Sequence, residues 1–498
     1  MNPETAELAI AEAPSQAALP TAQSAPVRGW RARAAARAAR VGAARESWRA
    51  LWISHAIAWG AGIVAVLAFG FGPTRTALNP RGLTRGLGAL GNVLAAPVAR
   101  WDSAWYLVIA HYGYRPDLAP YTSARTAYFP VFPLTIRAVS WLGAPLVLAG
   151  VLVSFAAFGL ALYGIHRLTS LELASGTQRL SSHLAEVPRL AVIVMAFSPM
   201  AFFFSAIYSE SLFLAFSVGL FWSARQGRWA LAGLCGALAA ATRSTGLMLI
   251  VPALLLYFYG PREDRPPDRS PAPPREDGAG AVDGRPARGA GATRRGEGAR
   301  RLIAAIVPHY RLRRELLWLA LLPAGVALYA AWLGLSGGDP LGPFHAEQAW
   351  ERHLVGPIVG VWDGLKAGFD GARQLLSFQR RHVYFPLAAG NPFVVASHNL
   401  LNLAFLLAAV AAFVGVIRRL PLAYGAYALA AIALPLSYPV TPQPLMSIPR
   451  YLIVLFPLSI WLAAWLAERP RLQRPAFALS VAAMAFFAAQ FATWHWVA

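Results

Sequence analysis

Cysteine and lysine are almost absent from this sequence. Its 498 residues include one cysteine, Cys235, and one lysine, Lys366. A single cysteine excludes a disulfide framework and a thiolate metal site, and the apolar run around Cys235 favours a small buried residue. Arginine therefore supplies nearly all of the positive charge. Together with abundant alanine, glycine and proline, this composition indicates a bacterial genome rich in G and C.

Motifs for soluble cofactors and metals are missing as well. The sequence has no glycine-rich phosphate loop after a strand, no Asp-x-Asp pair and no histidine and cysteine cluster with metal-ligand spacing. We therefore expect neither a cofactor nor a bound metal. A sugar transferase built from this chain would need a donor that arrives through the lipid phase rather than as a nucleotide sugar.

Charged residues are scarce, whereas apolar residues dominate. Hydrophobic residues make up 57% of the chain, charged residues make up 13%, and the mean hydropathy is +0.46. Apolar runs of roughly 17 to 25 residues recur, and about ten or eleven of them are long enough to cross a bilayer as helices. The proline-containing stretch 128–145 instead favours a short, broken or interfacial helix. The sequence therefore predicts an all-α polytopic membrane protein.

Positive charge is gathered in two places. Seven arginines lie between Arg28 and Arg49, and thirteen more lie between Arg262 and Arg314. A net charge of +21 could suggest a nucleic-acid partner. Both clusters adjoin predicted spans, however, and so indicate the cytoplasmic side, where anionic lipid headgroups attract arginine. We expect contacts with membrane lipids and none with nucleic acid.

This topology divides the chain into four parts. Residues 1–50 are expected to be a disordered, arginine-rich cytoplasmic tail. Residues 51–260 are a first membrane part with a catalytic outer loop over 72–127, and residues 261–301 are a disordered, low-complexity cytoplasmic linker. Residues 302–498 are a second membrane part, and residues 336–395 within it form a second outer loop.

Acidic side chains inside the apolar sequence are rare. Of the 23 acids, fifteen fall in predicted cytoplasmic segments and eight fall on the predicted outer side. Among those eight, only Asp102 and Glu210 lie in aromatic, apolar sequence near membrane depth. A charge kept there is costly and usually lines a cavity or a pathway. These two carboxylates are therefore the leading candidates for a functional site.

Asp102 lies in the stretch RWDSAWYLVIAHYGY, which begins at Arg100. The acid could simply cap an interfacial helix. A desolvated carboxylate between aromatic rings can also accept a proton from a hydroxyl nucleophile, and we favour this general base. The rings of Trp101, Trp105 and Tyr106 in the same stretch suit either an interfacial belt or the face of a sugar. His111 and Tyr114 are possible hydrogen-bond donors.

Glu210 and two arginines supply the other candidate groups. Glu210 follows Pro199 in SPMAFFFSAIYSESLF, where it could cap the next helix or belong to a site. Arg243 in ATRSTG and Arg450 in SIPRYLIVLFP fall at predicted outer ends of spans, where the positive-inside rule does not place them. Either they snorkel to headgroups, or they bind a phosphate through paired hydrogen bonds.

Five sequence motifs follow one another along the chain: RWDSAWYLVIAHYGY, YFPVFPL, SPMAFFFSAIYSESLF, ATRSTG and PRYLIVLFPL. In this order they resemble the PIG-V family, the mannosyltransferases that add the second mannose in GPI-anchor assembly. The resemblance extends over about residues 51–467. It implies a GT-C glycosyltransferase fold with its site on the extracytoplasmic face, a polyprenyl (dolichyl) phosphate mannose donor, and inversion at the anomeric carbon.

The resemblance also suggests roles for particular residues. It implies that Trp101 and Asp102 are the Trp-Asp pair of the first outer loop, with Asp102 as the catalytic base. It further matches the Tyr-Ser-Glu group and the late Arg-Tyr pair, which are Tyr208 to Glu210 and Arg450 with Tyr451. Assigning Arg243 and Arg450 to the lipid phosphate is our own inference.

The acceptor is the least determined part of this hypothesis. Because the composition is bacterial, we expect an enzyme of the plasma membrane that mannosylates an envelope glycolipid or lipoglycan. A GT-C enzyme for another lipid-linked sugar, such as arabinose, is an alternative. A lipid or solute transporter is a second one, disfavoured because no internal repeat is evident and the membrane-depth acids gather on one side.

Overall fold

The structure is a computed structural model, and the part of the chain that it describes is helical. The described residues are 25–73, 75, 78–114, 123–174, 184–268, 307–386, 388 and 390–497. The chain divides into two compact units, Met1–Gly42 and Ala43–Ala498. All of the packing described below lies within the second unit.

The first helix, α1 (Ala25–Phe69), begins inside the segment that we expected to be a disordered tail. That expectation is wrong for residues 25–50. Alanine and arginine dominate this stretch, and both are strong helix formers. Residues 1–24 lie outside the described residues.

The expected disordered linker, residues 261–301, also begins with an ordered stretch. Arg262 is buried, and its guanidinium carbon lies 4.7 Å from the ring centroid of Trp229 and 5.0 Å from that of Tyr310. Such cation–π contacts hold an arginine against the protein surface. The expectation is therefore wrong for this first stretch, and residues 269–306 lie outside the described residues.

Five helical segments are long and apolar enough to cross a membrane. They belong to α1, α5 (Leu146–Ala174), η6 with α11 (Arg314–Ala320 and Leu321–Leu335), α14 (Pro392–Arg419) and α18 (Pro470–Ala492). Among the described residues we find no strand, apart from an isolated bridge between Arg81 and Arg85. The prediction of an all-α polytopic membrane protein is confirmed.

The other apolar helices are shorter than the roughly 20 residues of a full crossing. They are α4 (Val131–Ser140), α6 (Val187–Ala196), α7 (Glu210–Arg225), α8 (Trp229–Ala240), η5 with α9 (Ser244–Leu249 and Ile250–Tyr259), α15 (Leu422–Leu436) and α17 (Phe456–Ala467). Helix α6 ends at Ala196, within an apolar stretch, and η4 (Ala201–Phe204) follows after a break. Pro199 explains the break, because proline lacks the N–H that a helix needs.

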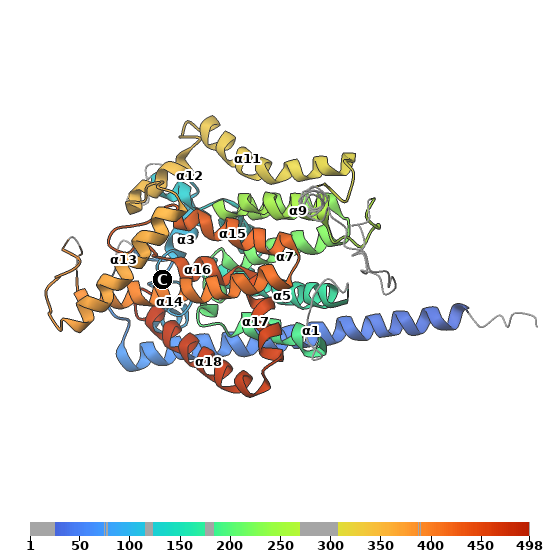
Figure 1. The fold of residues 1–498 in the computed structure, drawn as a ribbon. Coiled ribbons are helices and arrows are strands. Elements are labelled where there is room, and N and C mark those ends of the chain that lie inside the picture. Colours follow the sequence, from blue (N-terminus) through green and yellow to red (C-terminus); the bar gives the residue numbers. More distant parts are fainter. Residues whose placement is uncertain are drawn as a thin grey trace, which may run out of the picture. The chain divides into compact units, whose positions relative to one another are not determined.

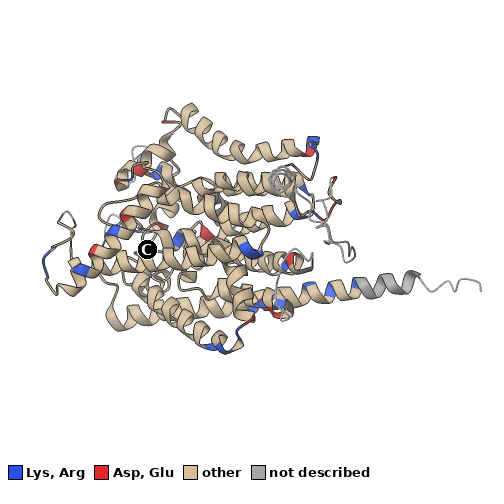
Figure 2. Cartoon of the chain, viewed as in Figure 1, with Lys and Arg blue, Asp and Glu red and all other residues tan. Residues whose placement is uncertain are grey.

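Helix α7 runs through the packed helices of this unit, against α5, α8 and α9 (Figure 1). It approaches α5 closely, since a Cβ on Gly164 would lie 2.6 Å from Val218 Cγ1. Its first residue, Glu210, and its last, Arg225, are both buried. Apart from the arginine-rich first half of α1, charged residues elsewhere lie mainly at helix ends and in connections (Figure 2).

Both predicted outer loops contain ordered elements. The first holds α2 (Gly88–Ala95), α3 (Ser103–Tyr112) and η2 (Ser123–Ala127). The second holds α12 (Gly342–His345), η7 (Ala346–Trp350) and α13 (Pro357–Leu376). A further short helix, α16 (Ile448–Ile453), precedes α17. Together these short elements position the site.

Candidate active site

A cavity of about 130 Å³ lies among these short elements. Segments far apart in the sequence line it: Asp102, Tyr106, Ala127, Tyr128, Phe129, Thr242, Arg243, Ser244, Glu347, Trp350, Arg352, Met446, Ser447, Arg450, Tyr451 and Trp496. Sites for drug-sized ligands usually measure about 300 to 1,000 Å³. This cavity therefore suits one polar headgroup rather than a whole lipid-linked molecule.

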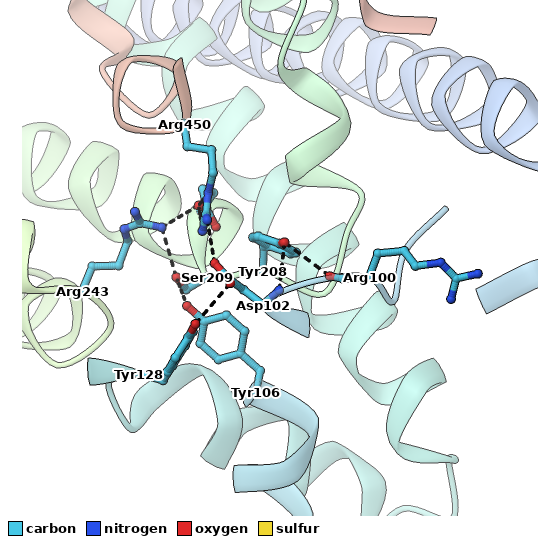
Figure 3. A network of polar contacts seen from close by, with 9 residues as sticks. Arg100, Asp102, Tyr106, Tyr128, Tyr208, Ser209, Arg243 and Arg450 are labelled. Carbon is cyan, nitrogen blue, oxygen red and sulfur yellow. Dashed lines mark hydrogen bonds and ion pairs between the residues drawn. The ribbon is translucent and has the colours of Figure 1, made fainter. Parts of the chain in front are cut away.

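Asp102 is held on both sides of its carboxylate. Arg450 Nη1 lies 2.6 Å from Oδ2, and the Tyr128 hydroxyl donates to Oδ1 at 3.1 Å (Figure 3). The Asp102 backbone N–H donates to the Tyr208 hydroxyl at 3.2 Å, and that hydroxyl donates to the Arg100 carbonyl at 3.3 Å. Tyr208 thus fixes the backbone that carries the acid.

The backbone turns sharply just before Asp102. Trp101 has a φ of 53°, in the left-handed region that costs energy for a residue with a side chain. The Trp101 ring packs against Trp494 and Trp496, with centroid distances of 5.5 and 5.0 Å, and Arg75 lies above it at 4.6 Å. Trp101 is therefore outside the cavity lining, while its neighbour Asp102 belongs to it.

Arg450 joins the two carboxylates that the sequence singled out. Besides Asp102, it reaches Glu210 Oε1 with Nε at 2.9 Å and with Nη2 at 2.8 Å. Its helix, α16, follows Ser447, which has a φ of 70°. Glu210 is fully buried and is not part of the cavity lining. It lies behind Arg450 and acts as a counter-ion, so its contact with a ligand passes through the arginine.

Arg243 completes the charged group. Its Nη1 lies 2.7 Å from Glu210 Oε1 and donates to Ser209 Oγ at 3.3 Å, and Ser209 Oγ lies 2.8 Å from the Tyr106 hydroxyl. The guanidinium carbon also lies 5.3 Å from the ring centroid of Tyr451. Arg243 thus reaches the cavity from the loop after α8.

We call Asp102, Glu210, Arg243 and Arg450 the α7 N-terminal cluster. Two carboxylates and two guanidinium groups balance one another in charge. A buried ion without a partner costs several kcal/mol, and such groups persist when they are paired and hydrogen-bonded. The two arginines also line the cavity, so they can offer several N–H donors to an anion there.

The remaining candidates of the first outer loop lie around this cluster rather than in it. Trp105 stacks on Tyr128 with a centroid distance of 5.1 Å. Tyr114 donates a hydrogen bond to the Tyr128 carbonyl and packs against Tyr329. His111 is exposed at the end of α3, against the ring of Tyr112. None of Trp105, Tyr114 and His111 lines the cavity.

Sequence reasoning missed several lining residues. Tyr128 is the first residue of the motif YFPVFPL, and Ser209, which does not line the cavity but accepts a hydrogen bond from Arg243, belongs to the Tyr-Ser-Glu group, so a signal for both existed. Glu347 was counted among the outer acids but assigned to a loop without a role. Trp350 and Arg352 carried no signal, because only the fold brings their segment to the cavity.

A second buried charged group lies at the other end of α7. Arg225 binds Glu172 through Nε to Oε1 and through Nη2 to Oε2 at 3.4 Å, and the Tyr424 hydroxyl donates to Glu172 Oε1 at 2.7 Å. Arg225 Nη1 also donates to the Pro261 carbonyl at 2.7 Å. We call Glu172, Arg225 and Tyr424 the α7 C-terminal cluster.

This cluster corrects two statements made from the sequence. Glu172 is one of the fifteen acids that we assigned to predicted cytoplasmic segments, yet it is completely buried within α5, which continues to Ala174. Buried charges therefore lie at both ends of α7, and their gathering on one side cannot exclude a transporter. Within the described residues, no three His, Cys, Asp or Glu side chains converge as metal ligands.

Known proteins resemble part of this chain. Residues 77–255 match the family model described as Mannosyltransferase (PIG-V). The protein "GPI alpha-1,6-mannosyltransferase 2" of Rattus norvegicus is 30% identical over 164 residues, which are 32% of this chain and 32% of that protein. The protein of the same name from Mus musculus is 31% identical over 158 residues, 31% of this chain and 30% of its own length. No solved structure matches.

The aligned part thus spans about a third of those relatives. The segment that matches the family model includes three of the four charged residues of the α7 N-terminal cluster, because Asp102, Glu210 and Arg243 all lie between residues 77 and 255. Arg450 lies beyond it and reaches the same cluster through the fold. Residues 77–255 of this chain are thus similar to the mannosyltransferase family PIG-V.

Proposed function

We propose that this chain is a membrane glycosyltransferase that moves mannose from a polyprenyl (dolichyl) phosphate mannose donor to a hydroxyl group of an envelope glycolipid or lipoglycan. The family of residues 77–255 supports the reaction class and the sugar. The single observation that carries the proposal is the cavity in which an acid and two arginines meet: Asp102, Arg243 and Arg450.

In the proposed reaction the arginines hold the donor. Arg243 and Arg450 present N–H groups to the cavity, and a guanidinium binds phosphate oxygens in pairs. As the bond between the sugar C1 and the phosphate oxygen breaks, its electron pair stays on that oxygen. The arginines stabilise the negative charge that develops there, and Glu210 holds both of them in place.

Asp102 is the proposed proton acceptor. The hydroxyl oxygen of the acceptor attacks C1 from the side opposite to the phosphate, so the anomeric configuration inverts, and its proton passes to the Asp102 carboxylate. In the structure Arg450 pairs with Asp102 Oδ2. A phosphate that engages Arg450 competes for this cation, which leaves the carboxylate freer to take up a proton.

The location of the cavity supports an extracytoplasmic site. It lies at the Glu210 end of α7, whereas the Arg225 end contacts Pro261, where the second arginine-rich segment begins. Arginine-rich segments stay on the cytoplasmic side. We therefore propose a GT-C arrangement in the bacterial plasma membrane, with the first and second membrane parts, 51–260 and 302–498, sharing one outward-facing site.

The test is mannose transfer by the purified chain with a synthetic polyprenyl phosphate mannose. General base catalysis usually contributes about 10² to 10⁴-fold. We expect Asp102→Asn to lower kcat by that factor while the protein expresses and unfolds as the parent does. Near-normal transfer by Asp102→Asn would refute the assignment of the base.

The same assay distinguishes the alternatives. An enzyme for another lipid-linked sugar would use a polyprenyl phosphate arabinose in preference to the mannose donor. A transporter would move lipid across a vesicle membrane without consuming either donor. In the producing bacterium, deletion of the gene should leave an envelope glycolipid short by one hexose, which mass spectrometry detects.

A further inference from the structure

The cavity has a second wall that the proposed reaction does not use. Residues 346–352, which we call the Glu347 segment, include η7 and the turn after it, and the segment packs against η2. Backbone hydrogen bonds close the turn, from Glu351 N to Gln348 O at 2.9 Å and from Arg352 N to Glu347 O at 3.2 Å. The segment is thus a built part of the cavity.

Glu347 differs from the carboxylates of the α7 N-terminal cluster in what it binds. Its side chain is 34% exposed, and Arg352 Nε lies 3.7 Å from its Oε2, beyond hydrogen-bond distance. Its carboxylate accepts no hydrogen bond from the residues that the structure describes. Burial raises the pKa of Glu347, and the charge of Asp102 adds to this, while Arg352 opposes it. Because no described residue donates to this carboxylate, both of its oxygens can accept hydrogen bonds from a ligand when Glu347 is ionised.

An aromatic ring stands beside this carboxylate. The half-buried Trp350 meets Trp105 edge to face at 6.0 Å and Tyr128 at 6.1 Å. Tyr128 is also the donor to Asp102, so the aromatic group connects the Glu347 segment with the proposed base. A flat apolar ring next to hydrogen-bond acceptors suits a sugar, which has apolar C–H faces and a rim of hydroxyl groups.

Charge separates the two walls of the cavity. The wall formed by Arg243 and Arg450 attracts a phosphate, whereas the negative charge of Glu347 disfavours one nearby. In an in-line displacement the attacking hydroxyl and the leaving phosphate lie on opposite sides of the sugar carbon. The acceptor therefore needs a wall that does not hold the phosphate. In the Glu347 segment the one arginine, Arg352, lies 3.7 Å from Glu347 itself, so its charge is offset by that carboxylate.

We propose that the Glu347 segment is the acceptor subsite, in which Glu347 holds hydroxyl groups of a sugar or polyol headgroup and Trp350 packs against its ring. This inference rests on the proposed function. It assigns donor and acceptor to different walls: the donor phosphate to Arg243 and Arg450, and the acceptor to Glu347 and Trp350.

Kinetics of the purified full chain test the subsite, with octyl α-mannoside as acceptor probe and polyprenyl phosphate mannose as donor. Because a carboxylate that binds hydroxyls contributes strongly, Glu347→Gln should raise the acceptor KM about 10-fold or more. The donor KM and the slow hydrolysis of the donor by water should stay as in the parent. The matched control is Glu351→Gln, which removes an exposed charge of the same segment outside the lining and should change neither value.

Two kinetic results would overturn the inference. One is a fall in kcat at saturating acceptor with an unchanged acceptor KM, which would make Glu347 part of the chemistry instead. The other is a rise in the donor KM that equals or exceeds the rise in the acceptor KM.

Thiol protection tests the subsite even if the parent transfers no mannose, a result that would refute the proposed function alone. The single cysteine makes this simple: Glu347→Cys and Ser244→Cys are each made together with Cys235→Ala. Octyl α-mannoside should slow maleimide labelling at position 347, and polyprenyl phosphate should slow it at position 244, which lies beside Arg243. Protection of position 347 by polyprenyl phosphate and not by the mannoside would overturn the inference.

Discussion

Helix α7 carries a buried charged cluster at each end, and the two clusters have different surroundings. At the first residue, Glu210 shares Arg243 and Arg450 with Asp102, and three of these four residues line a cavity. At the last residue, Arg225 pairs with Glu172, both side chains are 0% exposed, and neither borders that cavity. By the helix rise the two ends lie about 22 Å apart.

The difference shows that a buried ion pair by itself says little about function. Both clusters join segments distant in the sequence, and in both a tyrosine hydroxyl donates to the acid, Tyr128 to Asp102 and Tyr424 to Glu172. The C-terminal cluster, which we call the closed end of α7, borders neither this cavity nor the groove described below. Its interactions join α5, α7, α15 and the Pro261 carbonyl, so they serve packing. The N-terminal cluster exposes its arginines and one acid to a cavity, where a ligand can replace one charge partner with another.

Cavity size is no better guide. A larger groove of about 600 Å³ lies among α6, α14, α17 and α18, and its lining is mostly apolar side chains such as Leu190, Phe405 and Leu462. It is the right size for part of a lipid. Glu186, Arg189 and Arg474 also line the groove, but within the described residues no ion pair joins them. The smaller cavity is therefore the better candidate for the proposed group transfer.

The largest effect is expected at the closed end of α7. Arg225→Met removes the guanidinium that binds Glu172 while this acid stays buried beside Tyr424, which should lower the free energy of unfolding by about 3 to 5 kcal/mol. Thermal unfolding in detergent measures this, and the folded fraction should keep its transfer rate. Removing both charges with Glu172→Gln and Arg225→Met should recover most of the stability. If Arg225→Met lowered the transfer rate without lowering the stability, the C-terminal cluster would not be purely structural.

At the open end, Arg450→Lys should reduce activity rather than stability. Lysine is a single point of charge and cannot bridge Asp102, Glu210 and a phosphate as a guanidinium does. We expect kcat/KM to fall by about 10² to 10³-fold, as for other losses of transition-state donors. Arg418→Lys, at an exposed arginine, is the control. A drop in unfolding temperature as large as that of Arg225→Met would mean that the two ends do not differ.

The two tyrosines allow a matched pair of smaller changes. Tyr128→Phe removes the donor to Asp102 Oδ1, and hydrogen bonds to charged groups contribute about 1.5 to 3 kcal/mol, so kcat should fall roughly 10- to 100-fold. Tyr424→Phe removes the corresponding donor to Glu172 and should lower the unfolding temperature while kcat stays unchanged. Initial transfer rates and thermal unfolding of both variants are compared. An equal loss of transfer rate in Tyr128→Phe and Tyr424→Phe would contradict the difference between the two ends of α7.

The smallest effect is expected at His111. This residue shares the motif of Asp102 but is exposed outside the cavity lining. His111→Ala should leave kcat and both KM values within about twofold, as surface substitutions usually do. A tenfold loss in the transfer assay would show that the cavity extends toward the end of α3.

Part of the site could be predicted because charged residues are rare in the apolar segments of this chain. Asp102 and Glu210 were conspicuous as acids near membrane depth, and Arg243 and Arg450 as arginines at predicted outer ends. The structure brings these four together. Their assignment to substrate and catalysis stays a prediction, which the variants above examine.

Other candidates could not be sorted from the sequence. Trp101 and Asp102 are neighbours, yet the left-handed backbone at Trp101 sends the ring toward Trp494 and the acid toward Arg450. Glu172 has the composition of a loop around it, but the extension of α5 buries it. A direction or a burial of this kind depends on backbone torsions and on distant partners, which motif spacing does not contain.

The sequence by itself determined that the chain is a helical membrane protein, which family model its segment 77–255 matches, and which rare charges are candidates for a site. Hydropathy, composition and motif order are properties of the sequence itself, so they can be read without a structure. Only the tertiary structure decided that Glu210 stands behind the arginines, that the Glu347 segment forms a cavity wall, and that α7 has a closed end as well as an open one. These depend on contacts between segments up to 348 residues apart, where packing and not sequence distance sets the neighbours.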